Sequence, residues 1–276
     1  MAAHPRISVS GLCFPELSAV ETIEVVAGLG VANTSLTGRK VRESGADKVA
    51  AAARAHGVRV VTTTGALGPG LRRADADADA RHAAGGAGDA WLRDARRDVD
   101  NAATVGAGVV YGLTGPRPIA DWDESAAAYR HAIAPLVAYA AERGIVLAVE
   151  PTSWLYADLT FVHTFHDALR LARPAGLGVC VDFFHVWTEG ELRTELRDHG
   201  DAVAHVQLSD MVLGDRSLPC RAVPGDGGIP LEELVRWTLD GGYAGVFDVE
   251  LNGPRVDVIG AAAAERAVTW LTRVLS

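Results

Sequence analysis

Short runs of β-branched residues alternate eight times along this chain with longer stretches of helical period. Apolar residues that recur every two residues indicate strands, and those that recur about every 3.6 residues indicate helices. We predict strands at residues 7–10, 31–36, 58–63, 108–113, 145–150, 178–182, 204–208 and 245–250. We predict helices at residues 19–29, 46–56, 90–105, 125–143, 161–172, 191–199, 231–240 and 261–275.

Eight strand–helix units in a chain of 276 residues predict one fold above the others. They match a (β/α)8 TIM barrel, an α/β fold that typically takes about 250 residues and forms a single domain. The 49% of hydrophobic residues are enough for one large core. The rival fold is a doubly wound open sheet, in which a glycine-rich phosphate turn should follow the first strand. Here Ser10-Gly-Leu-Cys-Phe-Pro-Glu follows instead, without the glycine spacing of that turn.

One segment, residues 65–89, interrupts the alternation. It contains Gly68-Pro-Gly, an Ala/Asp alternation over residues 74–80 and Gly85-Gly-Ala-Gly. The segment is too polar and glycine-rich for a core helix, and it follows the third strand on the face where barrel active sites form. We expect a flexible loop over 65–89, either a lid over the site or an insertion without a role.

Composition excludes several classes of protein. A net charge of −9 and a pI near 5.5 argue against a nucleic-acid-binding surface. The two lysines, Lys40 and Lys48, both stand early, so the second half offers no Schiff-base lysine. Cys13, Cys180 and Cys220 form no CxxC pair, which disfavours a disulfide framework or a thiolate zinc site. Without a signal-peptide core or a membrane-spanning run, we expect a cytoplasmic protein with no membrane contact.

Polar side chains stand at the ends of the last four predicted strands. They are Glu150, Asp182, Gln207 and Glu250. The carboxyl ends of barrel strands point into one bowl, so these groups should converge. Three carboxylates close together would take up protons unless a cation neutralised them. Oxygen donors alone suit Mg²⁺ or Mn²⁺, and a nearby imidazole would extend the choice to Co²⁺ or Zn²⁺.

Two histidines stand near these strand ends. His185 lies three residues after Asp182, and His205 lies two residues before Gln207. By the two-residue pleat, His205 shares a face with Gln207 but lies deeper in the barrel. We therefore expect His205 to make buried hydrogen bonds rather than to bind a metal.

Five segments of the second half have a familiar order and spacing. They are Val149-Glu-Pro151, Asp182-Phe-Phe-His185, His205-Val-Gln-Leu-Ser-Asp210, Pro224-Gly-Asp-Gly-Gly-Ile-Pro230 and Gly242-Tyr-Ala-Gly-Val-Phe-Asp-Val-Glu250. Together they resemble the xylose isomerase-like TIM-barrel superfamily. Within it they are similar to the sugar-phosphate isomerase/epimerase branch, which includes ketose 3-epimerases, hydroxypyruvate isomerase and inosose dehydratase. The resemblance covers nearly the whole chain, although its specific motifs all fall between residues 149 and 254.

The resemblance implies a set of site residues. A single divalent metal ion would be held by the four side chains at the strand ends, Glu150, Asp182, Gln207 and Glu250. His185 would contact substrate, and Arg221 stands where several relatives place a substrate-binding arginine. Ketose 3-epimerases usually have histidine at the position of Gln207, whereas hydroxypyruvate isomerase-like members use glutamine. The amide oxygen favours Mn²⁺ or Mg²⁺ over Zn²⁺. Members often dimerise or tetramerise, so the resemblance also allows a homo-oligomer.

The aromatic residues near the strand ends admit two interpretations. Trp154 is a candidate wall of a sugar pocket, in contact with substrate, and Phe14 is a weaker one. Aromatic residues at strand ends more often serve packing alone.

The predicted reaction is isomerisation or epimerisation of a small carbohydrate or keto sugar. Glu150 and Glu250 would accept and donate a proton through a cis-enediolate of the substrate. The same chemistry supports a lyase or dehydratase if a leaving group lies β to the carbonyl, as in a keto sugar, glycoside or natural product. An endonuclease IV-like DNA-repair enzyme shares the barrel, but it would need more histidines and a basic surface. A non-catalytic barrel is disfavoured because both glutamates are present.

Overall fold

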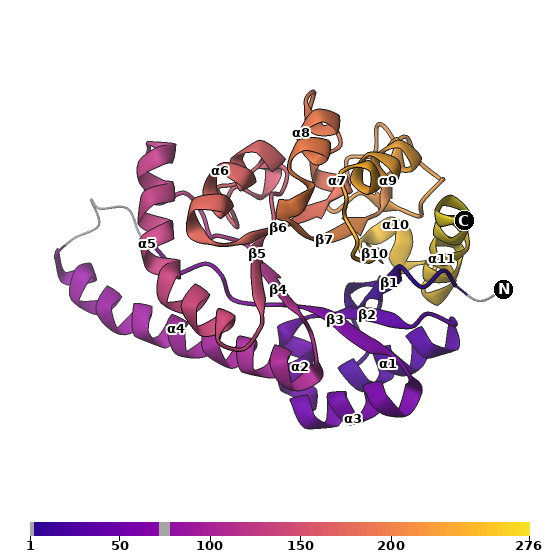
Figure 1. Cartoon of the computed structure of the whole chain (residues 1–276), viewed down its shortest axis with the longest axis horizontal. Helices are drawn as coiled ribbons and strands as arrows, with labels where there is room; N and C mark the ends of the chain where they lie inside the picture. The colour runs from indigo at the N-terminus through magenta and orange to yellow at the C-terminus, as the bar shows by residue number, and fades with distance from the viewer. Residues whose placement is uncertain (1–2, 72–77) are drawn as a thin grey trace.

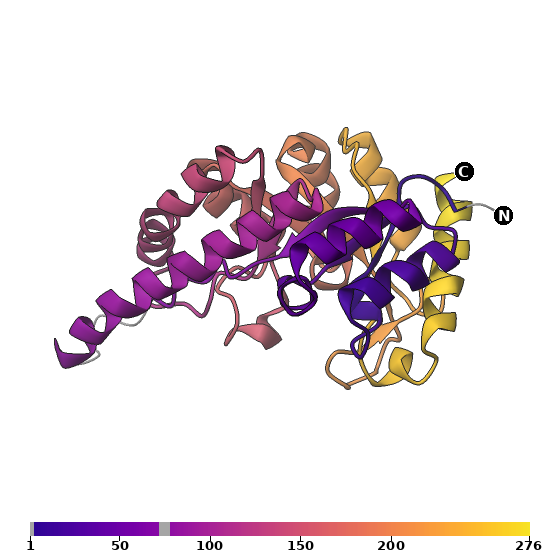
Figure 2. The ribbon, with the colours of Figure 1, turned by 90° about the horizontal axis from the view of Figure 1, so that it is seen from below.

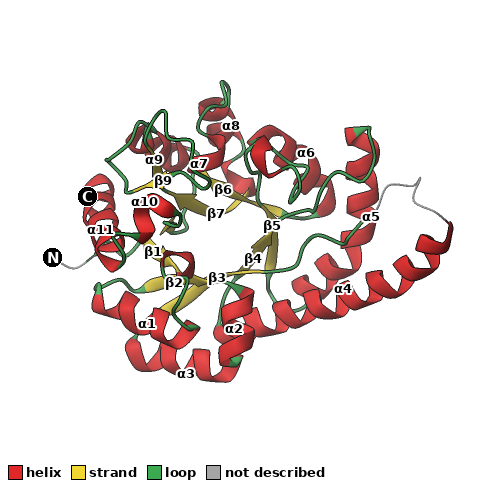
Figure 3. Ribbon diagram, turned by 180° about the vertical axis from the view of Figure 1, so that it is seen from behind, coloured by secondary structure: helices red, strands yellow, loops and turns green. Residues whose placement is uncertain are grey.

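A closed barrel of eight parallel strands forms the centre of the computed structural model, which describes residues 3–71 and 78–276. Figure 3 shows the strands enclosed by a ring of helices. The strands are β1 (Ile7–Ser10), β2 (Asn33–Leu36), β3 (Arg59–Thr64), β4 (Val109–Gly112), β5 (Val146–Val149), β6 (Gly178–Asp182), β7 (Val203–Leu208) and β10 (Phe247–Val249). They follow one another around the barrel in chain order, and β1 closes it by pairing with both β2 and β10. The predicted (β/α)8 barrel is confirmed, and the open sheet is wrong.

Helices cover the outside of the barrel (Figure 1). They are α1 (Ala19–Gly28), α2 (Gly38–Ser44), α3 (Ala46–His56), α4 (Ala78–Val105), α5 (Trp122–Ala141), α6 (Phe165–Ala175), α7 (Phe183–Val186), α8 (Leu192–Asp198), α9 (Leu231–Asp240), α10 (Pro254–Asp257) and α11 (Ala261–Leu275). Every residue of β1, β2 and β6 is buried, because a packed interior lies on one face and helices lie on the other.

Local signals account for several helix ends. A capping box of Ser18 and Glu21 starts α1, where each side chain binds the other residue's backbone N–H. Gly57 ends α3 with a φ of +65°, a left-handed conformation that glycine adopts without steric cost. These caps place each helix end at a defined residue, so the strand that follows starts in the register that closes the barrel.

Two short elements sit on the mouth side of the barrel. The 3-10 helix η2 (Trp154–Tyr156) follows β5. The strands β8 (Asp210–Met211) and β9 (Arg221–Ala222) form a separate antiparallel pair after β7. Because both segments follow barrel strands, they lie at the carboxyl end of the barrel, where (β/α)8 sites form.

The structure differs from the sequence prediction over part of residues 65–89. Residues 78–89, which we assigned to a loop, form the first part of the 28-residue helix α4. Figure 2 shows this part of α4 extending away from the barrel. Five alanines among these twelve residues favour helix, and elongation of an existing helix costs less than starting one. Residues 72–77 lie outside the described residues, and the lid stays a prediction.

Within 3–71 and 78–276, no helix combines the length and apolar character needed to cross a lipid bilayer.

Candidate active site

The four polar side chains predicted from the strand ends lie together at the mouth of the barrel. Glu150 follows β5, Asp182 ends β6, Gln207 lies in β7 and Glu250 follows β10. Asp182 and Gln207 are direct partners in the pairing of β6 with β7. None of the four is more than 9% exposed. Parallel strand ends therefore bring three carboxyl groups and one amide into a single buried cluster, as the sequence predicted.

Arg221 belongs to the same cluster. Its Nη2 lies 2.7 Å from Asp182 Oδ2 and 2.9 Å from Glu250 Oε1, and its Nη1 donates to Ser209 Oγ at 2.9 Å. The guanidinium is only 4% exposed and enters from β9, whose Arg221 pairs with Met211 of β8. The short hairpin thus turns a loop arginine back into the barrel mouth.

Gln207 links the cluster to β4 and β6. Its Nε2 donates to the Tyr111 hydroxyl at 3.0 Å and to Glu250 Oε2. Its Oε1 accepts a hydrogen bond from Cys180 Sγ at 3.0 Å. The amide nitrogen thus faces the carboxylates, and a 180° turn of the amide would present the oxygen instead. Metal binding by Gln207 requires that second orientation.

His185 lies beside Glu150 and Asp182 as a neutral imidazole. Its Nδ1 accepts a hydrogen bond from the Ser153 backbone N–H at 3.3 Å, so Nε2 carries the proton. Nε2 lies 3.6 Å from Asp182 Oδ2 and 4.0 Å from Glu150 Oε1. Burial lowers the pKa of His185 to about 4, despite the opposing effect of Asp182. In this tautomer the ring offers an N–H to a partner in the site.

Burial and neighbouring charges give the three carboxyl groups different pKa values. It raises the pKa of Glu150 well above its usual range, and the negative charges of Glu250 and Asp182 add to the effect. It raises the pKa of Glu250 to about 7, although Arg221 opposes the shift. Burial also acts to raise the pKa of Asp182, but Arg221, His185 and the Phe184 backbone N–H outweigh it and hold that pKa below its usual value. Asp182 is therefore the most acidic of the three, and both glutamates bind a proton more tightly than an ordinary glutamate side chain does.

The cluster suits a divalent cation in charge and in donor type. Ionised Glu150, Asp182 and Glu250 carry three negative charges and Arg221 one positive charge, which leaves two negative charges. Glu150 accepts no hydrogen bond from the described residues although it is nearly buried, an arrangement that is costly for a carboxylate without a partner. Ligand atoms of Glu150, Asp182 and His185 lie within 4.8 Å of one another. The residues present therefore fit a bound metal ion.

A buried polar network lies one layer below the cluster. His205 Nδ1 lies 3.1 Å from Thr62 Oγ1, and its Nε2 lies 3.4 Å from Asp248 Oδ2. Ser35 Oγ donates to the same Asp248 oxygen at 2.6 Å. The Tyr111 ring stacks on His205 with a centroid distance of 5.7 Å. His205 thus makes buried hydrogen bonds, as expected, and supports the tyrosine that holds Gln207.

Three residues of the site were missed in the sequence: Tyr111, Cys180 and Ser209. Tyr111 stands inside an apolar strand run, and a buried tyrosine hydroxyl usually needs a hydrogen-bond partner, which was the available signal. Cys180 precedes Asp182 by two residues on the same strand and therefore shares its face. No signal in the sequence singled out Ser209.

The two aromatic residues predicted as candidate walls of the pocket, Trp154 and Phe14, lie outside the carboxyl cluster. Trp154, predicted to contact substrate, is 73% exposed in η2. Its neighbour Tyr156 packs edge-on against His185, with ring centroids 5.4 Å apart. Phe14 is buried in the core. Tyr156 of the 3-10 turn thus contacts the site through His185, and substrate contact by Trp154 stays a prediction.

Asp210 organises the loop that follows β9. One oxygen accepts hydrogen bonds from the backbone N–H groups of Gly225 and Gly227, and the other accepts from Ile229 and Met211. All four distances are 2.8 to 3.0 Å. Residues 224–230 thus form a loop that Asp210 ties to β8 ahead of α9.

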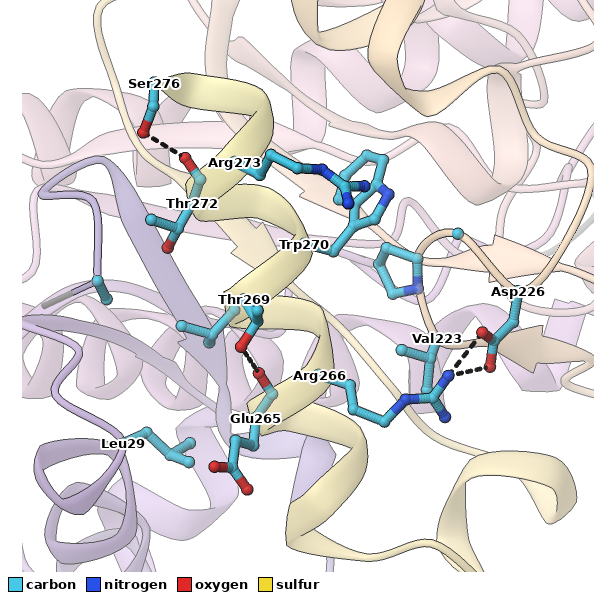
Figure 4. Close-up of a pocket in the computed structure, with 14 residues that line it drawn as sticks. Leu29, Val223, Asp226, Glu265, Arg266, Thr269, Trp270, Thr272, Arg273 and Ser276 are labelled. Carbon is cyan, nitrogen blue, oxygen red and sulfur yellow. Dashed lines mark hydrogen bonds and ion pairs between the residues drawn. The ribbon is translucent and has the colours of Figure 1, made fainter. Parts of the chain in front are cut away.

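Two cavities differ in their relation to the cluster. One of about 430 Å³ borders Glu150 and Glu250 and is otherwise lined mainly by leucine and glycine. A larger hollow of about 1010 Å³ lies on the outer flank, between α11 and the loop after β9. Figure 4 shows its Arg266–Asp226 ion pair, joined at 2.6 Å, and the Trp270 ring beside it. This larger hollow contains no residue of the acidic cluster, so the smaller cavity is the candidate substrate site.

Comparison with known structures shows the same architecture. The structure of 3-keto-D-glucoside 4-epimerase, YcjR, from E. coli is 20% identical with a TM-score of 0.73, covering 98% of this chain and 99% of that one. The structure of the IOLI protein with a binding zinc atom is 17% identical with a TM-score of 0.78, covering 98% of both chains. An AP endonuclease, family 2, from Brucella melitensis is 18% identical with a TM-score of 0.72, covering 98% of this chain and 99% of that one.

These similarities establish the fold alone, since identity is low and one fold hosts many activities. No curated protein matches the chain by sequence. The sequence profile of the family described as xylose isomerase-like TIM barrel matches residues 20–274. The chain therefore belongs to the xylose isomerase-like TIM-barrel family.

Proposed function

We propose that the protein is a divalent-metal-dependent isomerase or epimerase that acts on a small sugar or hydroxyketone. The observation that carries the proposal is the pair of buried glutamates at one cavity, Glu150 and Glu250, both with raised pKa values. A carboxyl group whose pKa lies near neutrality, as that of Glu250 does, can both accept and donate a proton at working pH. The epimerase among the similar structures acts on a keto sugar, which is consistent with this chemistry.

Four residues of the chain would hold the metal ion: Glu150, Asp182, Gln207 and Glu250. The oxygen donors favour Mn²⁺ or Mg²⁺, and participation of His185 would admit Co²⁺ or Zn²⁺. When bound, a divalent ion polarises a substrate carbonyl and acidifies the neighbouring C–H group.

Glu150 and Glu250 would move the substrate proton. They follow β5 and β10, which are separated around the barrel by β6 and β7, so they approach a substrate from different sides. One carboxylate removes the proton next to the carbonyl to give a cis-enediolate of the substrate, and the other returns a proton. Return to the same carbon from the opposite face gives epimerisation, and return to the neighbouring carbon gives isomerisation.

His185 and Arg221 would position the substrate. The Nε2–H of His185 can donate to a substrate oxygen, because Ser153 fixes the tautomer. Arg221 holds Asp182 and Glu250 in place through one nitrogen. Both residues are nearly buried, so their orientation is set before substrate binds.

A lyase is the second candidate. The cavity extends from the glutamates between leucine side chains, which leaves space for a leaving group on the carbon β to the carbonyl. Removal of the same proton would then expel that group. An endonuclease is not proposed, because the chain carries a net charge of −9 and no lysine or arginine among the described residues lines the cavity to bind a phosphate backbone.

Deuterium exchange tests the proposal directly. The Mn²⁺-loaded protein, incubated in D₂O with ketoses and keto sugars, should introduce deuterium at the carbon next to the carbonyl, as detected by NMR. Glu150→Gln and Glu250→Gln should each reduce this exchange by about a hundredfold or more, since each removes a group that transfers protons. Glu142→Gln, at the exposed end of α5, is the control and should exchange normally. A turned-over substrate that keeps every C–H bond would refute the proposal.

A further inference from the structure

The cavity beside Glu150 and Glu250 has two unlike ends. At one end lie the two carboxyl groups, and at the other lie leucine side chains and the backbone of glycines after β3 and β4. The leucines are Leu12, Leu67, Leu113 and Leu159. Apart from the hydroxyl groups of Thr64 and Tyr111 and the backbone, this wall offers a polyhydroxylated sugar no hydrogen-bond partner among the described residues, and each unsatisfied hydroxyl group would cost free energy. The apolar end therefore suits a substituent other than sugar.

Leu159 is held in this wall by its backbone rather than by burial. Its carbonyl accepts a hydrogen bond from Gly115 N–H at 2.9 Å, and its own N–H donates to Tyr156 O at 2.8 Å. The next residue, Thr160, forms a bridge with Gly115. The Leu159 side chain nevertheless remains 45% exposed. An apolar side chain that is fixed in place and left open at a site entrance is available to contact a ligand.

Exposed apolar side chains concentrate at the same end of the molecule. Among the described residues, eight large hydrophobic side chains are exposed, and seven of them lie in segments that follow barrel strands. These seven are Trp154, Leu155, Leu159, Leu213, Leu218, Val258 and Ile259. The exception, Val146, starts β5 at the opposite end. The mouth of the barrel is therefore apolar relative to the rest of the described surface.

The cavity is equally unsuited to a phosphate group. None of the residues that line it is lysine or arginine, within the part of the chain that the structure describes. The guanidinium of Arg221 binds Ser209, Asp182 and Glu250 through its two Nη atoms, and its Nε, which has no partner among the described residues, is buried. A phosphate dianion in the cavity would therefore lose its hydration without gaining a cationic side chain from the lining.

We propose that the substrate is an unphosphorylated keto sugar that carries an apolar substituent, with an aryl glycoside as the representative case. The apolar group lies against Leu159, Leu113 and Leu12, while the keto sugar faces Glu150 and Glu250. The cavity volume of about 430 Å³ lies within the range of roughly 300–1,000 Å³ for sites that bind molecules of this size. This inference rests on the proposed function for the identity of the reacting end.

Binding measurements test the apolar end independently of turnover. Titration calorimetry on the Mn²⁺-loaded protein would compare methyl and phenyl 3-keto-β-D-glucopyranosides and the 6-phosphate of the methyl compound. The phenyl glycoside should bind at least about tenfold more tightly than the methyl glycoside, because it buries more apolar surface. The phosphate should bind more weakly than either. Equal affinities for the phenyl and methyl glycosides, or preference for the phosphate, would overturn the inference.

A matched pair of variants tests whether the leucine side chains of the cavity cause the tighter binding of the phenyl glycoside. Leu159→Asn keeps the side-chain size but makes it polar, and it should reduce the phenyl-to-methyl preference to less than about threefold. Val146→Asn is the control. Val146 is 46% exposed, against 45% for Leu159, but it lies at the opposite end of the barrel, so this variant should keep the full preference for the phenyl over the methyl glycoside. Thermal unfolding of both variants would verify that they are folded.

Two other outcomes are distinguishable. If the phenyl preference is present but no substrate exchanges deuterium, the proposed function fails while the apolar pocket stands. If exchange occurs without a phenyl preference, the function stands and this inference fails. Light scattering, which measures the oligomeric state, supplies the remaining control. If Leu159→Asn converts a dimer to a monomer and leaves the ligand preference unchanged, the exposed apolar side chains at the barrel mouth bind a second copy of the chain and not the substrate.

Discussion

Arg221 Nη2 lies 2.9 Å from Glu250 Oε1, and both side chains are almost completely buried. The same nitrogen contacts Asp182, so one guanidinium neutralises part of the charge on two carboxyl groups that come from different strands. Arg221 lowers the pKa of both acids. The arginine therefore stabilises the carboxyl cluster as well as lining the site.

Arg221→Met should destabilise the protein strongly, because it leaves two buried carboxyl groups without their cation. The expected loss in the free energy of unfolding is about 3–5 kcal/mol in the absence of metal. Urea unfolding measures it, and addition of Mn²⁺ should restore part of the loss. Arg255→Met is the control, since its ion pair with Asp215 is partly exposed and should contribute little to stability. If both substitutions lowered the free energy of unfolding equally, the buried ion pairs of Arg221 would contribute no more to stability than the exposed pair.

Gln207→His should change the metal preference of the site. An imidazole at this position replaces the amide oxygen with a nitrogen donor, which favours Zn²⁺ and Co²⁺ over Mn²⁺ and Mg²⁺. We expect the ratio of Zn²⁺ to Mn²⁺ affinity to rise by about tenfold or more, as measured by competition with a metal-binding dye. Gln207→Leu provides the comparison, because it removes the donor and should weaken both metals. An unchanged ratio in the histidine variant would mean that this side chain does not contact the ion.

Glu189 should make stability depend on pH. Burial raises its pKa to about 7, although its carboxylate accepts the Phe165 N–H at the start of α6. The folded state thus binds a proton that the unfolded state releases near pH 4.5, so stability falls as pH rises from about 4.5 to 7. The group is partly exposed, so we expect a contribution on the order of 1 kcal/mol.

Thermal unfolding between pH 4.5 and 8 checks this prediction. Glu189→Gln should make the profile less steep over that interval, because the amide does not titrate, and Glu150 and Glu250 account for the slope that remains. Glu191→Gln, an exposed neighbouring acid, serves as the control. A profile for Glu189→Gln that falls as steeply as that of the native protein would contradict the assignment.

Asp210→Asn should loosen the loop between β9 and α9. One carboxylate oxygen receives the N–H groups of Gly225 and Gly227, and an amide NH₂ in its place would face those donors. The expected cost is about 2–3 kcal/mol, since hydrogen bonds to a buried charged group are lost. Hydrogen exchange of the loop amides should rise in parallel. Asp226→Asn, in the same loop but in an exposed pair with Arg266, should change neither quantity appreciably.

Most of the architecture follows from local pattern. The eight strand positions and the ends of most helices agree with the prediction because hydrophobic period, glycine caps and strand-end acids are properties of neighbouring residues. The convergence of Glu150, Asp182, Gln207 and Glu250 follows from the barrel itself, since parallel strands end on one face. The start of α4 was predicted wrongly because the glycines of residues 85–88 disfavour a helix, whereas the alanines around them and the helix that follows favour one.

The sequence by itself determined the barrel and which acids would meet at its mouth. Only the tertiary structure decided what surrounds them: Tyr111 reaches Gln207 across 96 residues, and Arg221 reaches Asp182 across 39. Such partners depend on side-chain direction and on the return of the β8–β9 hairpin, which no local period encodes. Burial then sets the proton affinities, because the pKa of a carboxyl group depends on the charges and solvent around it rather than on its neighbours in the chain.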